Sequence, residues 1–505
     1  MKTKILALVL AMLMLLSLVA CNNSNNDNKD GNGTTASTDT TGNGDNGDTT
    51  TGDKKPGQTP DEWGSHLPTD TYDDEEFTFM FRASNRYLNG IYAENDVTNT
   101  SVEKAVYERL ANIETTYKIK FFADTSTGSD ASDMITAVGN LAKSGTDPFE
   151  VFGGHAQGTP WSLAINGNLY EWGDLPLIQL DAEYWSQNAK EQFSTPGGKV
   201  YFMTGDISYW TVAAAFCMFF NKDIVDNVQD LESPYDKVRN EEWTFETFAE
   251  YVTTLESNMS SGDSSSTIET GDWGYVTSNT RGPCQILVTT KYPMLAKDDT
   301  TKTGYKSNMT KQVFEKAVAD FIALGSTGSA YLSDSMNYTE LKGAFTSGRS
   351  AFYDDEVYFA TDWTAAGMNF GVLPWPKYNE DTELYNSMVN AGNDSFGIPI
   401  NTTERNAQRI SVVLENMAYH GTEIVEFYYN VILTYQDVKD EDSIEMMDHI
   451  HKGVNFDFGY YYNPGSLCTI TTKCKNNKSS LSTTYKSIEG QVNDALMKWS
   501  ALDEE

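Results

Sequence analysis

Polar and aromatic side chains gather where short apolar runs of this sequence begin or end. Candidates adjoining six such runs are Arg82, Asn85 and Arg86; His155, Gln157 and Trp161; Asp206, Tyr209 and Trp210; Asn279 and Arg281; Asp355 and Tyr358; and Asn393 and Asp394. Planar rings stack on the C–H faces of a sugar, while Asp, Asn, Arg and His bind its hydroxyl groups. Each candidate also has a structural alternative, because a loop Asp can cap a helix and a strand-end Trp can pack in a core.

Hydrolytic, nucleotide and metal chemistry has weaker support. Asp354, Asp355 and Glu356 could supply the two carboxylates of a glycosidase, which lie about 5–10 Å apart, but acidic residues are common throughout this chain. The nucleophile motif G-x-S-x-G and the phosphate-binding motif G-x-x-x-x-G-K-[ST] do not occur. His449 and His451 are two apart, whereas metal ligands on one helix face are three or four apart. We therefore predict no metal, no cofactor and no catalytic residue.

The chain contains five cysteines, too few for a fold built on disulfides. Cys217 lies in an apolar run and is predicted to be a buried thiol. Cys468 and Cys474 lie in a Thr-rich segment and form a possible disulfide if the chain is exported.

The N-terminus has the features of an export signal. Lys2 and Lys4 precede an apolar run over 5–20, which is short for a membrane-spanning helix. The run ends Leu-Val-Ala-Cys, which resembles the bacterial lipobox. This resemblance implies removal of residues 1–20 and diacylation of Cys21, and two acyl chains give stable anchoring. An ordinary signal peptide with an incidental Cys is the alternative. Residues 21–60, rich in Asn, Asp, Gly and Thr, are predicted to be a disordered tether.

The remaining sequence, 61–505, alternates strand and helix patterns, which predicts an α/β fold with mostly parallel sheets. Expected strands cover 76–82, 119–122, 149–152, 210–220 and 273–277. Expected helices include one capped by Thr100 and Glu103, one over 134–141, one capped by Thr244, one over 313–322 ended by Gly325, and one over 410–417 ended by Gly421. The net charge of −36 in 505 residues argues against a nucleic-acid partner.

Several segments resemble motifs of the family 1 extracellular solute-binding proteins. In that family an apolar strand ends in a Tyr/Phe-Asn-Lys-Asp/Glu turn, as in Phe-Asn-Lys-Asp at 220–223. The other similar segments are the Trp-Thr-Phe-Glu helix start at 243–246, Ala-Ile-Asn-Gly-Asn-Leu at 164–169, Phe-Thr-Ser-Gly-Arg-Ser-Ala-Phe at 345–352, Pro-Trp-Pro at 374–376 and Phe-Gly-Ile-Pro at 396–399. Their order and spacing over about 75–420 carry the resemblance, and the last part of the chain matches poorly.

The resemblance implies a periplasmic-binding-protein type II-like fold, with two α/β lobes joined by a hinge and a ligand cleft between them. Lobe 1 would cover about 70–212 and 394–435, and lobe 2 about 213–393; the lobe of the helical part 436–505 stays open. It further implies a monomeric, membrane-anchored subunit that delivers a solute, above all an oligosaccharide, to an ABC permease. The alternatives are a lipid-anchored glycoside hydrolase and a surface adhesin, although an adhesin would predict repeats that the sequence lacks.

Overall fold

The structure is a computed structural model that describes residues 66–83, 86–94, 100–128, 130–145, 149–259, 267–438 and 440–504. The predicted signal peptide, the lipidation of Cys21 and the tether over 21–60 lie outside these residues. Contacts within Lys54–Glu505 make this range one compact unit.

The first of two five-stranded sheets has the order β2-β1-β3-β13-β4. Its strands are β1 (Glu75–Phe81), β2 (Ile119–Asp124), β3 (Val151–His155), β4 (Phe202–Met203) and β13 (Asp394–Gly397). β1 pairs in parallel with β2 and β3, whereas β13 is antiparallel to both β3 and β4. Phe77, Phe79 and Phe81 alternate along β1, as the period-2 pattern predicts. They share one core with apolar residues of the helices α2 (Ser101–Tyr117) and α14 (Glu404–Phe427).

The second sheet has the order β11-β5-β10-β6-β9. Its strands are β5 (Phe216–Asn221), β6 (Trp273–Thr277), β9 (Ala330–Leu332), β10 (Ser350–Glu356) and β11 (Phe370–Leu373). β9, β6 and β10 are parallel, and β5 is antiparallel to β10 and β11. Both sheets therefore have three neighbouring parallel strands, then one antiparallel strand, then an edge strand. Two short pairs complete the strands: β7 (Leu295–Lys297) with β8 (Tyr305–Ser307), and β12 (Ser387–Met388) with β14 (Val454–Asn455).

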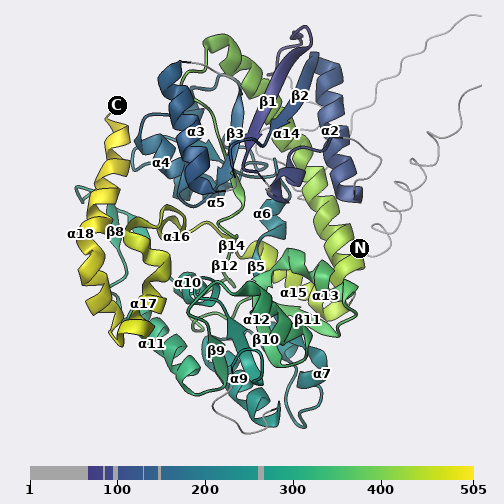
Figure 1. Cartoon of the computed structure of the whole chain (residues 1–505), viewed down its shortest axis with the longest axis vertical. Coiled ribbons are helices and arrows are strands. Elements are labelled where there is room, and N and C mark those ends of the chain that lie inside the picture. Colours follow the sequence, from purple (N-terminus) through teal and green to yellow (C-terminus); the bar gives the residue numbers. More distant parts are fainter. Residues whose placement is uncertain are drawn as a thin grey trace, which may run out of the picture. The chain divides into compact units, whose positions relative to one another are not determined.

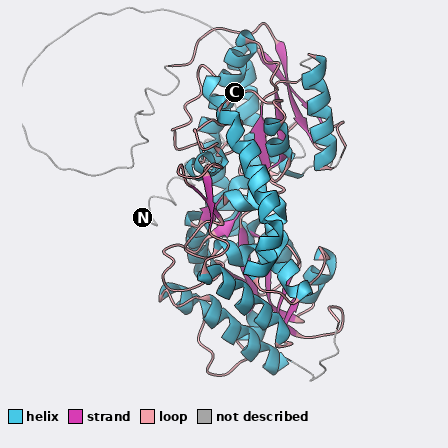
Figure 2. Cartoon of the chain, turned by 90° about the vertical axis from the view of Figure 1, so that its left-hand side faces the viewer, coloured by secondary structure: helices cyan, strands magenta, loops and turns pink. Residues whose placement is uncertain are grey.

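Helices surround the two groups of strands (Figure 2). The α-helices are α2 (Ser101–Tyr117), α3 (Ala131–Ser144), α4 (Thr159–Ile165), α5 (Gln187–Phe193), α6 (Trp210–Ala213), α7 (Lys222–Val225), α8 (Pro234–Arg239), α9 (Phe245–Met259), α10 (Arg281–Val288), α11 (Gln312–Ser326), α12 (Tyr338–Thr346), α13 (Ala360–Ala365), α14 (Glu404–Phe427), α15 (Glu441–Lys452), α16 (Phe458–Tyr462), α17 (Ile470–Asn477) and α18 (Leu481–Ser500). Short 3-10 helices cover Arg86–Gly90, Trp172–Asp174, Val357–Phe359, Pro464–Thr469 and Ala501–Asp503, and a π-helix covers Tyr428–Val438. The predicted capping box at α2 is confirmed, since the Thr100 amide donates to Glu103 Oε2 at 2.8 Å and the Glu103 amide to Thr100 Oγ1 at 3.4 Å.

The chain passes between the sheets in three places. The first crossing, 204–215, and the second, 389–393, pair with each other through the bridge Ala215–Val389. The Asn390 amide also donates to the Ala214 carbonyl at 2.8 Å. The third crossing is α14 with the π-helix that follows it: α14 packs on α2, and the π-helix packs on α13 and α15. These crossings place the two sheets end to end rather than face to face (Figure 1).

The C-terminal part of the chain contacts elements of both sheets. The rings of Trp499 on α18 and Trp161 on α4 lie 4.7 Å apart. The start of α18 is held instead by α11, since the Leu481 amide donates to Glu315 Oε1 at 3.0 Å. Figure 1 shows α18 running beside both groups of elements, and α17 next to α10 and α11. The segment 454–504 therefore contacts elements beside both sheets, whereas α15 packs on β11 of the second sheet.

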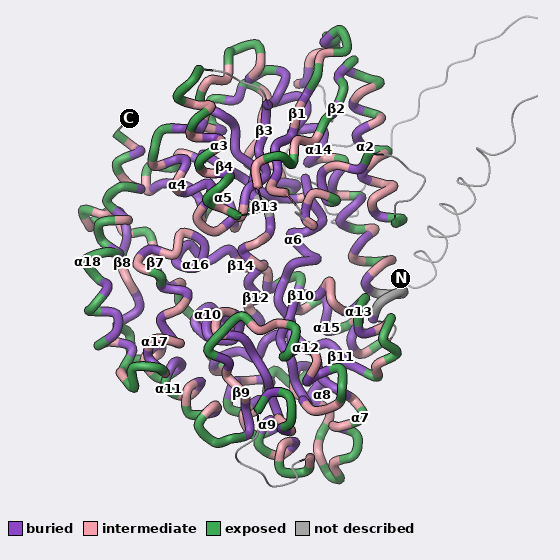
Figure 3. Tube along the Cα trace, viewed as in Figure 1, coloured by how far each residue is buried: buried purple, intermediate pink, exposed green. Residues whose placement is uncertain are grey.

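Three predicted elements are wrong in their bounds. The apolar run 210–220 is not one strand, because α6 precedes β5; the run is buried throughout, so its composition alone does not distinguish helix from strand (Figure 3). α11 runs past Gly325 to Ser326. α14 runs past Gly421, whose lack of a side chain matters for packing instead: a Cβ there would lie 1.9 Å from the Asp206 carbonyl oxygen.

The possible disulfide between Cys468 and Cys474 is not formed. All four cysteines among the described residues are buried free thiols, including Cys217 in β5, for which a buried thiol was predicted. Helical geometry separates the predicted pair: Cys474 points to Thr484 Oγ1 on α18, at 3.3 Å, whereas Cys468 lies against Cys284 of α10, whose Sγ contacts the Cys468 carbonyl.

Candidate functional site

The facing edges of the two sheets form the candidate site. In the first sheet, Phe81 and His155 end parallel strands, and His155 pairs with Asp394 at the start of β13. In the second sheet, Thr277 and Glu356 end parallel strands, and Glu356 pairs with Phe216, where the chain enters β5 from the first crossing. Ligands of open α/β sheets bind beyond the carboxyl ends of strands, where the chain direction changes. Both sheets thus place the carboxyl ends of their parallel strands at the same junction, where the chain crosses from one sheet to the other.

One ion pair joins the two edges. Arg86, at the start of the 3-10 helix Arg86–Gly90, contacts both carboxylate oxygens of Glu356 through Nη2. Among the ion pairs of the described residues, this is the only one that links a segment beside the first sheet to a strand of the second. The Glu356 side chain is 1% exposed and that of Arg86 36%. Asn390 of the second crossing donates to Glu356 Oε1 at 2.6 Å. Burial raises the pKa of Glu356, and Arg86 opposes that shift.

Four aromatic rings enclose the Arg86 guanidinium. Its Cζ lies 4.8 Å from the ring centre of Tyr87, 5.4 Å from Trp210, 5.6 Å from Tyr358 and 5.3 Å from Phe359. Trp210 in turn lies edge-to-face with Tyr87 at 4.8 Å and tilted against Tyr358 at 4.9 Å. We call these four rings the aromatic cage. They are contributed by the segment after β1, the first crossing and the segment after β10, so the cage exists only where the two edges meet.

A second, fully buried network lies beside Glu356. Arg281, at the start of α10, pairs with Asp355 Oδ1 at 2.7 Å and donates to the Tyr353 hydroxyl at 2.8 Å. Tyr353 donates to Asp355 Oδ2 at 2.7 Å, which closes a ring of three residues. Arg281 also lies 4.1 Å from the ring centre of Tyr338. Burial raises the pKa of the neighbouring Asp354 to about 7, against the opposing charge of Arg281.

The first sheet contributes a basic and polar rim at the second crossing. Arg82 donates to the Gly392 carbonyl at 3.1 Å. His155 Nδ1 lies 3.0 Å from the Gln157 carbonyl oxygen, and Gln157 Nε2 donates to the Tyr460 carbonyl at 2.7 Å. Burial, helped by Arg82, lowers the pKa of His155 to about 4. The Asn393 carbonyl accepts from the Ala156 amide at 2.9 Å, so backbone pairing continues past β3 and holds this rim against the crossing.

The structure brings some predicted residues together and leaves others apart. Arg86, Trp210 and Tyr358 meet in the cage, while Arg281 and Asp355 lie beside it and Arg82, His155, Gln157 and Asn393 form the rim. Tyr209 stacks between Trp210 and Tyr428 at the back of the cage.

Three predicted residues are held elsewhere and two cannot be placed. Trp161 is 1% exposed and packs among Phe202, Phe458, Tyr462 and Trp499. Asp206 accepts from Thr422 on α14 at 2.7 Å, and Asn279 donates to the Asp334 carbonyl at 3.1 Å. Asn85 and the side chain of Asp394 lie outside the described part of the chain.

Three residues of the site were not among the sequence candidates: Tyr87, Phe359 and Asn390. Tyr87 and Phe359 directly adjoin the predicted positions Arg86 and Tyr358, so a window of one residue on each side would have found them. Asn390 carries a weaker signal, since it lies in a polar stretch before β13 that could equally be a turn.

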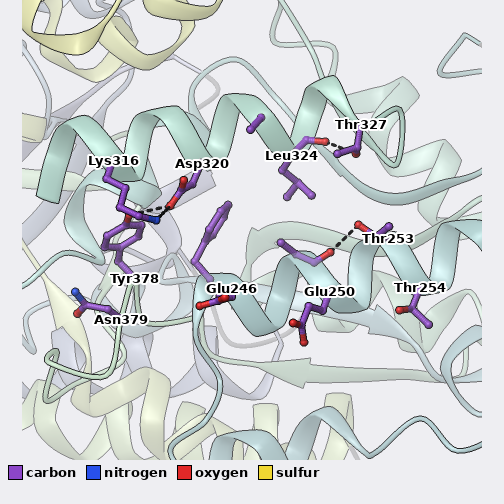
Figure 4. A pocket seen from close by; sticks show the side chains of 13 residues that line it. Glu246, Glu250, Thr253, Thr254, Lys316, Asp320, Leu324, Thr327, Tyr378 and Asn379 are labelled. Carbon is purple, nitrogen blue, oxygen red and sulfur yellow. Dashed lines mark hydrogen bonds and ion pairs between the residues drawn. The ribbon is translucent and has the colours of Figure 1, made fainter. Parts of the chain in front are cut away.

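A separate surface groove of about 900 Å³ lies between α9 and α11 (Figure 4). Glu246 and Glu250 line one side, and Lys316 and Asp320 the other. Lys316 pairs with Asp320 at 2.5 Å, and Tyr378 donates to Asp320 at 2.9 Å. None of the predicted site residues lines this groove, and it lies away from the carboxyl ends of the strands.

The described residues include no group of three or more His, Cys, Asp or Glu side chains arranged to hold a metal ion. No helix among them is both long enough and apolar enough to cross a membrane.

Comparison with known proteins identifies the fold. No protein-family model and no curated protein sequence matches the chain. An ABC substrate-binding protein from Listeria monocytogenes, solved in complex with cycloalternan, aligns with a TM-score of 0.52 at 12% identity, over 84% of this chain and 99% of that one. The maltose-maltodextrin binding protein of Alicyclobacillus acidocaldarius aligns with a TM-score of 0.50 at 12% identity, over 83% of this chain and 100% of that one. The predicted two-lobe, type II periplasmic-binding-protein-like fold is confirmed.

Proposed function

We propose that this chain is the lipid-anchored binding subunit of an ABC importer, and that it captures an oligosaccharide between its two lobes and delivers it to the permease. The observation that carries the proposal is the meeting of the two sheet edges at the Arg86–Glu356 pair, beside the buried ring of Trp210 and the half-buried ring of Tyr358. Both structural neighbours named above are carbohydrate-binding proteins by their descriptions. The sequence pattern that ends in Cys21 supports the anchor.

The chemistry of the junction suits a sugar. Trp210 and Tyr358 offer ring faces for C–H surfaces, and Glu356, Asn390 and Arg82 offer acceptors and donors for hydroxyl groups. In the proposed cycle the lobes part about the crossings, the ligand enters, and closure encloses it. The ligand shifts this equilibrium only by binding the closed arrangement more tightly than the open one.

The carboxylates are arranged for binding rather than hydrolysis. A glycosidase needs one carboxyl group that donates a proton and another that attacks or activates water. Asp355 is held by Arg281 and Tyr353, and Glu356 by Arg86 and Asn390. Each carboxylate thus accepts hydrogen bonds and pairs with an arginine, an arrangement that suits neither proton donation nor nucleophilic attack.

Isothermal titration calorimetry with linear and cyclic gluco-oligosaccharides, followed by chromatography of the recovered sugar, tests the proposal. We expect binding without cleavage, and a gain of ~2.7 kcal/mol in unfolding free energy at a ligand concentration a hundredfold above Kd. A shortened sugar would replace the proposal with a hydrolase, and a panel without any binding carbohydrate would contradict it.

A further inference from the structure

The aromatic cage holds a cation in this structure, and that cation is part of the protein. All four rings lie within about 6 Å of the Arg86 guanidinium, the range over which a ring face attracts a positive charge. Aromatic enclosures of this kind recognise cationic groups far better than neutral ones, because the attraction comes from the ring quadrupole. The cage is therefore chemically matched to a positive group.

Glu356 needs a positive partner in the same place. A carboxylate that is 1% exposed has lost its hydration, and a close cation or a bound proton offsets that loss. Other cations near the junction have partners of their own: Arg281 pairs with Asp355 at 2.7 Å, Lys342 pairs with Asp362 at 3.2 Å, and Arg82 donates to the Gly392 carbonyl at 3.1 Å. Arg86 is thus the charge that compensates Glu356.

The two members of this pair belong to different sheets. Arg86 follows β1 of the first sheet, and Glu356 ends β10 of the second. Any movement that parts the sheet edges withdraws Arg86, while Glu356, Tyr358 and Phe359 stay together on one continuous segment. The second sheet would then present half of the cage with a carboxylate that has lost its cation.

We infer that the captured saccharide carries a positively charged group, as in an oligosaccharide of amino sugars, and that this group replaces the Arg86 guanidinium between Glu356 and the cage rings. The inference rests on the proposed function and specifies its substrate class. Arg86 then acts as an internal competitor: it fills the site when the edges meet without ligand, and a ligand ammonium displaces it. A residue that merely contacted the sugar would have the opposite effect on affinity when removed.

The test is calorimetry on the full chain in mild detergent with three oligosaccharides of equal length: a glucosamine tetramer, an N-acetylglucosamine tetramer and maltotetraose. We expect the glucosamine tetramer to bind at least tenfold more tightly than either neutral tetramer. Arg86→Gln should tighten its binding at least threefold, and Glu356→Gln should weaken it at least tenfold. The matched control is Arg405→Gln, which removes an exposed arginine paired with Glu75 on the far side of the first sheet and should change no affinity.

The outcomes separate this inference from the proposed function. Neutral tetramers that bind as tightly as the amino tetramer, or weaker binding of all sugars by Arg86→Gln, would overturn the inference and leave sugar capture standing. If no oligosaccharide binds, the proposed function fails. A small cation then tests whether the cage binds a positive group: agmatine should raise the melting temperature of Arg86→Ala but not that of Arg86→Ala/Glu356→Gln. Equal responses of these two variants, both checked for native circular dichroism, would overturn the inference.

Discussion

The two sheets share one strand plan but present opposite charges at their facing edges. Each has three parallel strands, an antiparallel strand that arrives from a crossing, and an edge strand. The first edge carries Arg82, Arg86 and a neutral His155, whereas the second carries three acidic residues at the end of β10 and only Arg281 to balance them. The shared strand plan therefore sets where the site lies. The side chains at the strand ends determine the charge of each sheet edge, and so which charge the opposite edge must carry to balance it.

The acidic edge has one cation of its own, Arg281, which does not come from the other sheet edge. Arg281 and Asp355 are 7% and 0% exposed, so removing the cation leaves a buried carboxylate without compensation. We expect Arg281→Met to lower the free energy of unfolding by about 3–5 kcal/mol, measured by urea denaturation. Arg405→Met, which breaks an exposed pair with Glu75, should cost less than about 1 kcal/mol. Equal losses from the two substitutions would mean that the buried network carries no special stability.

Two tryptophans sharpen the contrast between the cage and the core. Trp161 and Trp210 are 1% and 2% exposed, and both were predicted to contact a ligand. We expect Trp161→Leu and Trp210→Leu each to lower the unfolding free energy by about 2–4 kcal/mol, because both leave cavities. Only Trp210→Leu should weaken oligosaccharide binding, by about tenfold or ~1.4 kcal/mol. Parallel losses of affinity in calorimetry would show that the cage has no distinct role.

The two edges should respond to pH in opposite directions. Asp354 faces Arg281, Asp355, Cys217 and Tyr275, and its pKa is raised from 3.8 to about 7, chiefly by burial. Between these values the folded chain holds a proton that the unfolded chain releases, so this contribution to stability falls as pH rises. His155 behaves in the reverse way: its pKa is lowered from 6.5 to about 4, so the unfolded chain holds the proton and stability falls as pH falls.

Single substitutions test the pH dependence of stability that each of these two groups contributes. Relative to the parent chain, Asp354→Asn should gain stability as pH rises from about 4 to 7, and His155→Gln should gain it as pH falls from about 6.5 to 4. Each slope approaches ~1.4 kcal/mol per pH unit for one fully linked proton. Urea denaturation across this range measures both slopes, and the double variant serves as the control. Slopes of the same sign would contradict the proposed difference between the edges.

The sequence predicted the strand ends well because the ends of apolar runs are local features. β1, β2, β3 and β6 begin and end within a few residues of their predicted bounds, and Arg86, Trp210 and Tyr358 meet as the strand-end rule requires. It could not predict partners that depend on three-dimensional closure. Asn390 meets Glu356 only because the two crossings pair, and Trp161 leaves the site because α18, far along the chain, covers it.

The smallest effect is expected at the α9–α11 groove, which has a volume of about 900 Å³ but lacks the buried charge of the junction. Its acidic side chains can stay hydrated, and Asp320 already has Lys316 and Tyr378 as partners. Glu246→Gln and Glu250→Gln should therefore change the unfolding free energy by less than about 0.5 kcal/mol and leave the calorimetric Kd for oligosaccharide unchanged. A marked loss of affinity in either variant would move the binding site to the groove. An unchanged affinity, set against the losses from Trp210→Leu, would show that the ligand binds at the junction of the two sheets and not in the groove.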